Sequence, residues 1–248
     1  MVLRDLVAKL RQSQLEAFST TEFRRLMQLE PASANSLLHR LVRQGWLERP
    51  RRGQYVLGPL LAGPEGLEGL SIATRLFEPC YVSFWSGLHQ LGWTEQVPKV
   101  IQVATTLRTA SHTYQALRVV AIHLDSRRFF GYQRQGQGQR SFLVAQPEKL
   151  LLDCLYLPRR SGGLDLLNEA VRIAAGRVNT TVLAEYACRF DRQSVTARLG
   201  FLLEEADVDA TVLLPLIGKT YQRLDPTRSR KGRYHRRWMV VDNRPEGT

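Results

Sequence analysis

The first 58 residues combine short amphipathic stretches with turn signals in an order that few small folds accommodate. Leucine and valine at helical spacing predict a first helix within residues 2–14. Ser19 or Thr20, followed by Glu22, is typical of a helix N-terminus with a capping box, and the second helix runs to about Gln28. Two short helices are therefore expected to open the chain.

A third helix is expected after Pro31, which should break the chain before Ser33 caps residues 33–44. Gly45 is placed to end this helix. One face forms an apolar stripe of Leu37, Leu38, Leu41 and Val42. The opposite, open side is polar and carries Ser33, Asn35, Ser36, His39, Arg40 and Arg43.

Two short strands are predicted directly after the third helix. Residues 46–48 and 54–57 alternate as strands do, and Gly53 permits the positive φ of a turn between them. The turn is basic, with arginines at three positions: Arg49, Arg51 and Arg52. A hairpin with a basic tip that follows a helix is typical of a wing.

The order of helix, helix, turn, helix and wing over residues 1–58 resembles the winged helix-turn-helix domain of prokaryotic transcription regulators. Such a domain lays its third helix in the major groove of DNA. The resemblance implies that the polar side of this helix contacts bases or phosphates, and that the wing arginines contact phosphates or the minor groove. Some winged domains bind only protein, but the asparagine, histidine and arginines favour DNA.

The distribution of charge also favours a nucleic-acid partner. The chain has 35 Lys and Arg against 23 Asp and Glu. Residues 1–58 hold ten against five, residues 222–248 hold eight against three, and the 163 residues between them hold 17 against 15. Two basic ends around a nearly neutral middle suit a polyanion. The C-terminal cations could also be a solvated charge run. The candidates there for further nucleic-acid contacts are Arg228, Arg230, Lys231, Arg233, Arg236 and Arg237.

The rest of the chain predicts a second domain of mixed type. Glycines and prolines in residues 59–66 indicate a linker, so this domain should cover residues 67–248. Short β-branched and aromatic runs within residues 99–145 predict a small, mostly antiparallel sheet. We expect helices before it, including one over residues 81–93, and a group of helices after it. The predicted fold class is therefore α+β.

Three segments of this second domain carry a family resemblance. They are "YVSFWSGLHQLGWTEQVPKVIQVATT", "RFFGY" and "VAQPEKLLLDCLYLPRRSGG", in that order. With them the chain resembles the AbiEi family, the antitoxin component of type IV toxin-antitoxin systems that act in abortive infection. A winged helix in front of such a domain is the family's usual plan.

The resemblance implies a repressor that binds inverted repeats in the promoter of its own operon and that also neutralises a nucleotidyltransferase-like toxin. It implies that the second domain is needed for neutralisation, with or without direct contact with the toxin. It also implies that basic residues of that domain add to operator affinity. The alternative is a winged-helix transcription regulator with a ligand-sensing or enzymatic C-terminal domain, which predicts a polar pocket with convergent acids.

The sequence offers little for catalysis. It lacks a Walker loop, a nucleophile elbow and an HExxH motif. The "DVD" of residues 207–209 has no Gly-Ser turn before it, so helix capping explains Asp209 better than a metal site, and Asp191 is likewise expected to cap a helix. The histidines show no metal-ligand spacing, and Cys80, Cys154 and Cys188 are interpreted as small buried hydrophobes. We predict no enzyme, no metal and no cofactor.

Residues 145–163 place a Lys, an Asp, a Cys and a Tyr close together. Pro147 suits the first turn of a helix, and Lys149 and Asp153 are one turn apart and can pair, with Tyr156 beside them. This stretch therefore predicts a core helix. The chain has no apolar run of the ~18 to 20 residues that a membrane span needs, so we expect a cytoplasmic protein.

Overall fold

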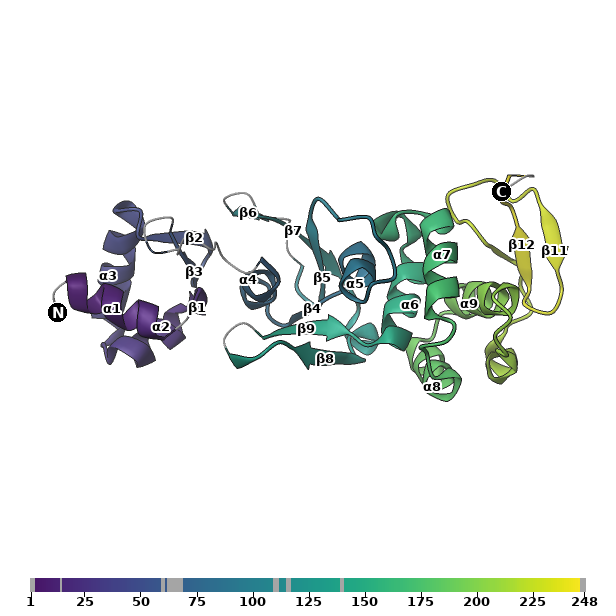
Figure 1. Cartoon of the computed structure of the whole chain (residues 1–248), viewed down its shortest axis with the longest axis horizontal. Helices are drawn as coiled ribbons and strands as arrows, with labels where there is room; N and C mark the ends of the chain where they lie inside the picture. The colour runs from purple at the N-terminus through teal and green to yellow at the C-terminus, as the bar shows by residue number, and fades with distance from the viewer. Residues whose placement is uncertain are drawn as a thin grey trace.

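The computed structural model describes residues 3–13, 15–58, 61, 69–108, 112–114, 117–138 and 141–245. The molecule is elongated, with the N-terminal helices at one end, a larger sheet in the middle and a small C-terminal sheet at the other end (Figure 1). All of the predicted linker except Leu61 lies outside the described residues. The division of the chain at residue 58 therefore stays a prediction.

The N-terminal part is a three-helix unit closed by a small sheet (Figure 1). Strand β1 pairs antiparallel with β3, which pairs antiparallel with β2. The sequence predicted the hairpin but not β1. The elements are α1 (Leu3–Gln12), β1 (Ala17–Ser19), α2 (Thr20–Met27), α3 (Pro31–Arg43), β2 (Leu47–Arg51) and β3 (Gln54–Leu57).

The helix boundaries of this unit confirm one predicted cap and correct another. Ser19 caps α2 with the reciprocal Glu22 bonds of a capping box. Helix α3, however, begins at Pro31 and not at Ser33. A proline is well suited to the first turn of a helix, where its missing N–H has no partner to lose. The turn into the wing uses Gly45 at φ 75°, as expected.

The middle of the molecule is a six-stranded mixed sheet in the order β6-β7-β5-β4-β9-β8. Three of its five pairings are antiparallel, and β5 with β7 and β4 with β9 are parallel. The elements are α4 (Gly69–Leu76), β4 (Cys80–Val82), α5 (Phe84–Gln90), β5 (Ile101–Thr105), β6 (His112–Tyr114), β7 (Leu117–His123), the 3-10 helix Ser126–Arg128, β8 (Tyr132–Gln135) and β9 (Phe142–Ala145).

Strand β4 corrects the helix predicted over residues 81–93. Only Phe84–Gln90 is helical, and the preceding Cys80–Val82 is a buried strand between β5 and β9. A short apolar run fits a buried strand and a helix equally well, so its periodicity did not separate the two. Strand β6 likewise lies where a polar loop was expected.

The helical group after the sheet follows the predicted order. Two local predictions were wrong. Asp191 ends α8 at φ 50° instead of capping α9, and "ATVLLPLIGKTY", residues 210–221, which predicts a last helix, forms only a short 3-10 helix that contains Pro215. The elements are α6 (Pro147–Tyr156), the 3-10 helix Pro158–Ser161, α7 (Leu164–Ala174), α8 (Thr180–Phe190), α9 (Gln193–Glu205) and the 3-10 helix Thr211–Leu216.

The C-terminal segment folds into a sheet of its own in the order β10-β12-β11. Its strands are β10 (Gln222–Arg223), β11 (Arg233–His235) and β12 (Val240–Asp242). Arg198 of α9 ties this sheet to the body, because its guanidinium donates to Arg223 O at 2.9 Å and to Leu155 O at 3.1 Å. Burial lowers the pKa of Arg198 to about 10.

Apolar packing joins the N-terminal unit to the middle sheet. Ala17 of β1 and Val56 of β3 belong to one buried cluster with Ile72 and Phe77, which lie in and just after α4. A salt bridge of 3.6 Å between Arg75 and Glu22 crosses the same junction. Strands β1 and β3 of the N-terminal unit therefore pack on α4, while the polar face of α3 is exposed in the part of the chain that the structure describes.

Candidate nucleic-acid interface

Helix α3 separates its side chains into a packed face and an open face. Ala34, Leu38 and Leu41 are fully buried, while Leu37 and Val42 of the predicted stripe are half-buried. All six residues predicted for the open side are exposed, namely Ser33, Asn35, Ser36, His39, Arg40 and Arg43. Packing against α2 and β2 thus holds the helix by one side only.

The open face of α3 is slightly hollowed. A concavity of about 480 Å³ is lined by Ser36, His39, Arg40, Arg43 and Gln44. Among the described residues, neither Arg40 nor Arg43 has an acidic partner. Their charge is therefore available to an anionic partner, and the neighbouring serine and histidine add short-range donors and acceptors.

The three wing arginines differ in their surroundings. Arg49 and Arg52 are exposed, and Arg49 lies over the Tyr55 ring at 5.9 Å. Arg51 instead donates to Leu76 O at 2.9 Å and lies over the Phe77 ring at 5.8 Å, so its charge is used at the junction with α4. Sequence reasoning could not separate Arg51 from its neighbours, because the partner lies in another domain.

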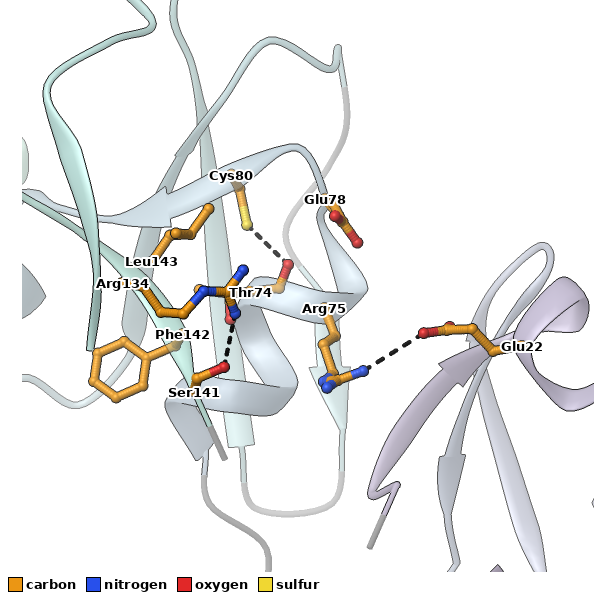
Figure 2. Close-up of a pocket in the computed structure, with 9 residues that line it drawn as sticks. All are labelled: Glu22, Thr74, Arg75, Glu78, Cys80, Arg134, Ser141, Phe142 and Leu143. Atoms are coloured by element: carbon orange, nitrogen blue, oxygen red, sulfur yellow. Dashed lines mark hydrogen bonds and ion pairs between the residues drawn. The ribbon is translucent and has the colours of Figure 1, made fainter. Parts of the chain in front are cut away.

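A polar groove of about 210 Å³ lies beside this junction (Figure 2). Three of its four charged lining groups have partners within the groove, since Arg75 pairs with Glu22 and Arg134 donates to Ser141 Oγ at 2.7 Å; the fourth is the exposed Glu78. The volume is below the roughly 300 Å³ at which ligand pockets begin. The groove thus lies where α2 of the N-terminal unit meets α4 and the middle sheet, and most of its charged groups are engaged there.

The reactive-looking residues of α6 are buried together. Lys149 Nζ donates to Asp153 Oδ1 and, at 2.8 Å, to the hydroxyl of Tyr81. Asp153 Oδ2 accepts from Tyr81 at 3.0 Å and from Ser83 at 2.8 Å. The predicted pairing of Lys149 and Asp153 is confirmed, but the tyrosine beside them is Tyr81 of β4 and not Tyr156.

The surroundings of this cluster are apolar and closed. Lys149 and Asp153 are both 0% exposed, and the rings of Tyr81, Phe130 and Phe190 surround the ammonium group at about 5 Å. Burial lowers the pKa of Lys149, although Asp153 opposes this effect. Burial and the Asp153 carboxylate raise the pKa of Tyr81. A cluster with satisfied groups and no exposed member suits structural stabilisation better than chemistry on a substrate.

The predicted cations of the C-terminal segment fall into two groups. Arg228 pairs with Asp225 and Arg237 with Glu204, while Arg230 donates to Tyr221 O. Within residues 222–245, all of which the structure describes, no acidic partner contacts the other three, which are Lys231, Arg233 and Arg236.

The described residues contain no group of three or more His, Cys, Asp or Glu that could hold a metal ion. Cys80 and Cys154 are buried as predicted, and burial raises the pKa of both thiols. Cys188 is exposed, so its predicted burial was wrong. Asp209 accepts a hydrogen bond from Thr211 N at 3.0 Å, but the N-cap of this 3-10 helix is Ala210, so the predicted cap position was wrong by one residue.

Three helices closed by a β1-β3-β2 sheet, with one open polar helix, define a winged-helix protein. Residues 5–58 match the family model described as "Transcriptional regulator, AbiEi antitoxin". The match confirms, over these residues, the resemblance to AbiEi antitoxins that the sequence predicted. The match is to this N-terminal unit, and the three segments of residues 81–163 that carried the resemblance lie outside it.

The fold of the whole chain is similar to a solved structure. The crystal structure of the RV2827C protein from Mycobacterium tuberculosis covers 96% of this chain and 90% of its own, with a TM-score of 0.65 at 17% sequence identity. This likeness supports the α+β architecture. No curated protein matches the chain. Within the part of the chain that the structure describes, no helix is long and apolar enough to cross a membrane.

Proposed function

We propose that this protein is a double-stranded DNA-binding antitoxin that represses its own toxin-antitoxin operon. The observation that carries the proposal is the open face of α3, where six polar residues are exposed together and two arginines have no acidic partner among the residues that the structure describes. A helix held from one side, with Asn, His and Arg on the other, fits the major groove in shape and chemistry.

The residues of this face would divide their roles by chemistry. Asn35 can make a bidentate contact with adenine, and Arg40 or Arg43 with guanine or with phosphates. The exposed wing residues Arg49 and Arg52 suit phosphates. Arg51 is left out of the proposed contacts because Leu76 O holds its guanidinium at the domain junction.

The experiment is a titration of the full chain against its own upstream DNA by gel shift or fluorescence anisotropy. Arg40→Ala with Arg43→Ala should weaken binding by at least tenfold, since a bidentate arginine contact contributes about 1–3 kcal/mol. The matched control removes two exposed arginines of the second domain, Arg172→Ala with Arg177→Ala, and should leave the affinity unchanged. Equal affinity in the α3 variant and the wild type would remove α3 from the interface.

We infer that the same protein neutralises a nucleotidyltransferase-like toxin and is itself no enzyme, acting in the cytoplasm beside its operator. The family match over residues 5–58 and the closed surroundings of Lys149 and Asp153 support this role. Co-expression with a toxin encoded next to it tests it: growth should recover with the full chain and with the Arg40 and Arg43 variant. If the wild-type protein did not restore growth, neutralisation of the toxin would be excluded, and the proposed role would be limited to regulation of transcription.

A further inference from the structure

The outer face of the C-terminal sheet presents an aromatic ring that sequence reasoning did not single out. Tyr234 in β11 is 58% exposed. The ring of Tyr221 contacts it edge-on, with centroids 4.9 Å apart, which orders the ring without covering it. The next residue along the strand, His235, packs against Phe201 of α9. Because side chains alternate along a strand, Tyr234 points away from the body.

The segment that contains this ring is rich in positive charge. Segment 222–245 holds eight Lys and Arg against two Asp. Both aspartates are engaged, Asp225 by Arg228 and Asp242 by Arg244. Three cations near the ring in sequence are exposed and, among the described residues, make neither an ion pair nor a side-chain hydrogen bond: Lys231, Arg233 and Arg236. The patch therefore keeps a net positive charge after its internal pairing.

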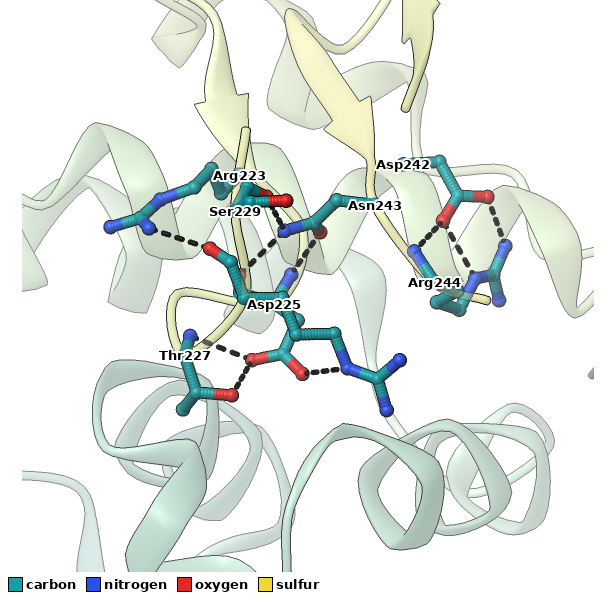
Figure 3. A network of polar contacts seen from close by, with 8 residues as sticks. Arg223, Asp225, Thr227, Ser229, Asp242, Asn243 and Arg244 are labelled. Atoms are coloured by element: carbon teal, nitrogen blue, oxygen red, sulfur yellow. Dashed lines mark hydrogen bonds and ion pairs between the residues drawn. The ribbon is translucent and has the colours of Figure 1, made fainter. Parts of the chain in front are cut away.

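The loop of residues 225–229, which precedes these cations in the chain, is fixed by a hydrogen-bond network (Figure 3). The side chain of Asn243 accepts from Asp225 N at 2.8 Å and donates to Asp225 O at 2.9 Å and to Ser229 O at 2.7 Å. Asp225 in turn accepts from the backbone and hydroxyl of Thr227. Little ordering entropy would then be lost on binding, which favours a specific contact over a diffuse charge effect.

We propose that this face binds single-stranded nucleic acid, with a base stacked on Tyr234 and phosphates held by Lys231 and Arg236 and, across the sheet edge that β11 forms, by the exposed Arg233. An exposed aromatic ring among cations is useful to a strand whose bases are unstacked, whereas the bases of a duplex are already stacked on one another. The face lies at the opposite end of the molecule from α3 (Figure 1). It is thus a second site, and it does not depend on operator binding.

The experiment measures fluorescence anisotropy of the full chain with three labelled probes: an oligouridine RNA of about 12 nucleotides, the matching oligothymidine DNA, and a duplex of the same length and unrelated sequence. Tyr234→Ala and Tyr234→Leu should each weaken binding of the single strands by roughly tenfold, because each removes the stacking surface. Tyr234→Phe keeps the ring and should bind as the wild type does. The duplex should not respond to any of the three variants.

The relative affinities for RNA and DNA identify which strand is preferred. Lys231→Gln, Arg233→Gln and Arg236→Gln together should reduce the salt dependence of single-strand binding by about two units, since each phosphate contact contributes roughly 0.7. The control replaces three exposed arginines elsewhere, Arg127, Arg172 and Arg177, by Gln and should leave the salt dependence unchanged. Wild-type binding by Tyr234→Leu, or no binding of either single strand by the wild type, overturns the proposal.

Discussion

Helices α3 and α6 begin alike and lie in opposite surroundings. Each has a proline in its first turn and an N-cap residue whose side chain makes no capping hydrogen bond. In α6 every residue from Glu148 to Leu155 is buried, whereas α3 buries Ala34, Leu38 and Leu41 on one side. The same start signal thus precedes a helix enclosed by the core and a helix with one face open.

The difference shows what burial demands of charged side chains. Lys149 and Asp153 are enclosed, and each of their polar atoms finds a partner within the core. Arg40 and Arg43 remain in water and need no partner in the protein. We therefore expect charge removal in α6 to act on stability and charge removal in α3 to act on binding.

The largest effect is expected for Lys149→Met. It leaves the Asp153 carboxylate buried without its cation, which should cost about 3–5 kcal/mol in the free energy of unfolding. Arg40→Met, the matched change on α3, should stay within about 0.5 kcal/mol of the wild type. Urea denaturation followed by circular dichroism measures both.

A double variant locates the source of this loss. Lys149→Met with Asp153→Asn replaces the uncompensated charge by a neutral amide that still accepts from Tyr81 and Ser83. Much of the lost stability should return. A Lys149→Met protein within about 1 kcal/mol of the wild type would contradict the contrast between the two helices.

Tyr81→Phe should cost less, about 1–2 kcal/mol, because it removes one hydroxyl that bridges Lys149 and Asp153 but leaves their ion pair. Tyr132→Phe is the matched control: its ring stacks on Tyr81, but the residue is 36% exposed. Urea denaturation should show that the free energy of unfolding of Tyr132→Phe equals that of the wild type. Equal losses in the two variants would mean that the buried hydroxyl of Tyr81 contributes no more to stability than the partly exposed hydroxyl of Tyr132 does.

How far the sequence predicts this molecule depends on the range of the interactions. The α2 cap and the open face of α3 follow from residues three or four apart, and the structure agrees with both. The Lys149 pair was likewise local, and was predicted. Lys149 also contacts Tyr81, which is 68 residues away in the sequence, and this contact was not predicted. Periodicity carries no information on such contacts.

The same limit explains what was missed at the candidate sites. Arg51 looked equivalent to Arg52 in the sequence, and only the packing of the wing on α4 distinguishes them. The exposed face of Tyr234 likewise depends on the pairing of β11 with β12, which a basic run of residues does not reveal. Strand β4 was hidden because a buried strand has no alternation to detect.

Arg51→Ala tests whether a cation of the N-terminal unit can contribute to stability, as Lys149 of α6 does, and not to DNA binding. It should lower the free energy of unfolding by about 1 kcal/mol, through loss of the bond to Leu76 O, and leave operator affinity nearly unchanged. Arg52→Ala should do the reverse, weakening operator binding without a change in stability. Denaturation and operator titration of both variants decide between them, and a loss of affinity in Arg51→Ala would return this residue to the DNA interface.

The smallest expected effect is a decline in the free energy of unfolding at alkaline pH. Because the pKa of Tyr81 in the folded protein is raised above its ordinary value of 10.0, the unfolded chain releases this proton first as the pH rises. The stability that Tyr81 contributes is thus present below pH 10 and is lost above it, by about 1 kcal/mol between pH 9 and pH 10.5. In the Tyr81→Phe variant this loss of stability with rising pH should be absent, whereas the Tyr132→Phe variant should still show it. Parallel pH profiles for the two variants would show that Tyr81 ionises as easily in the core as in the unfolded chain, contrary to the closed surroundings of α6.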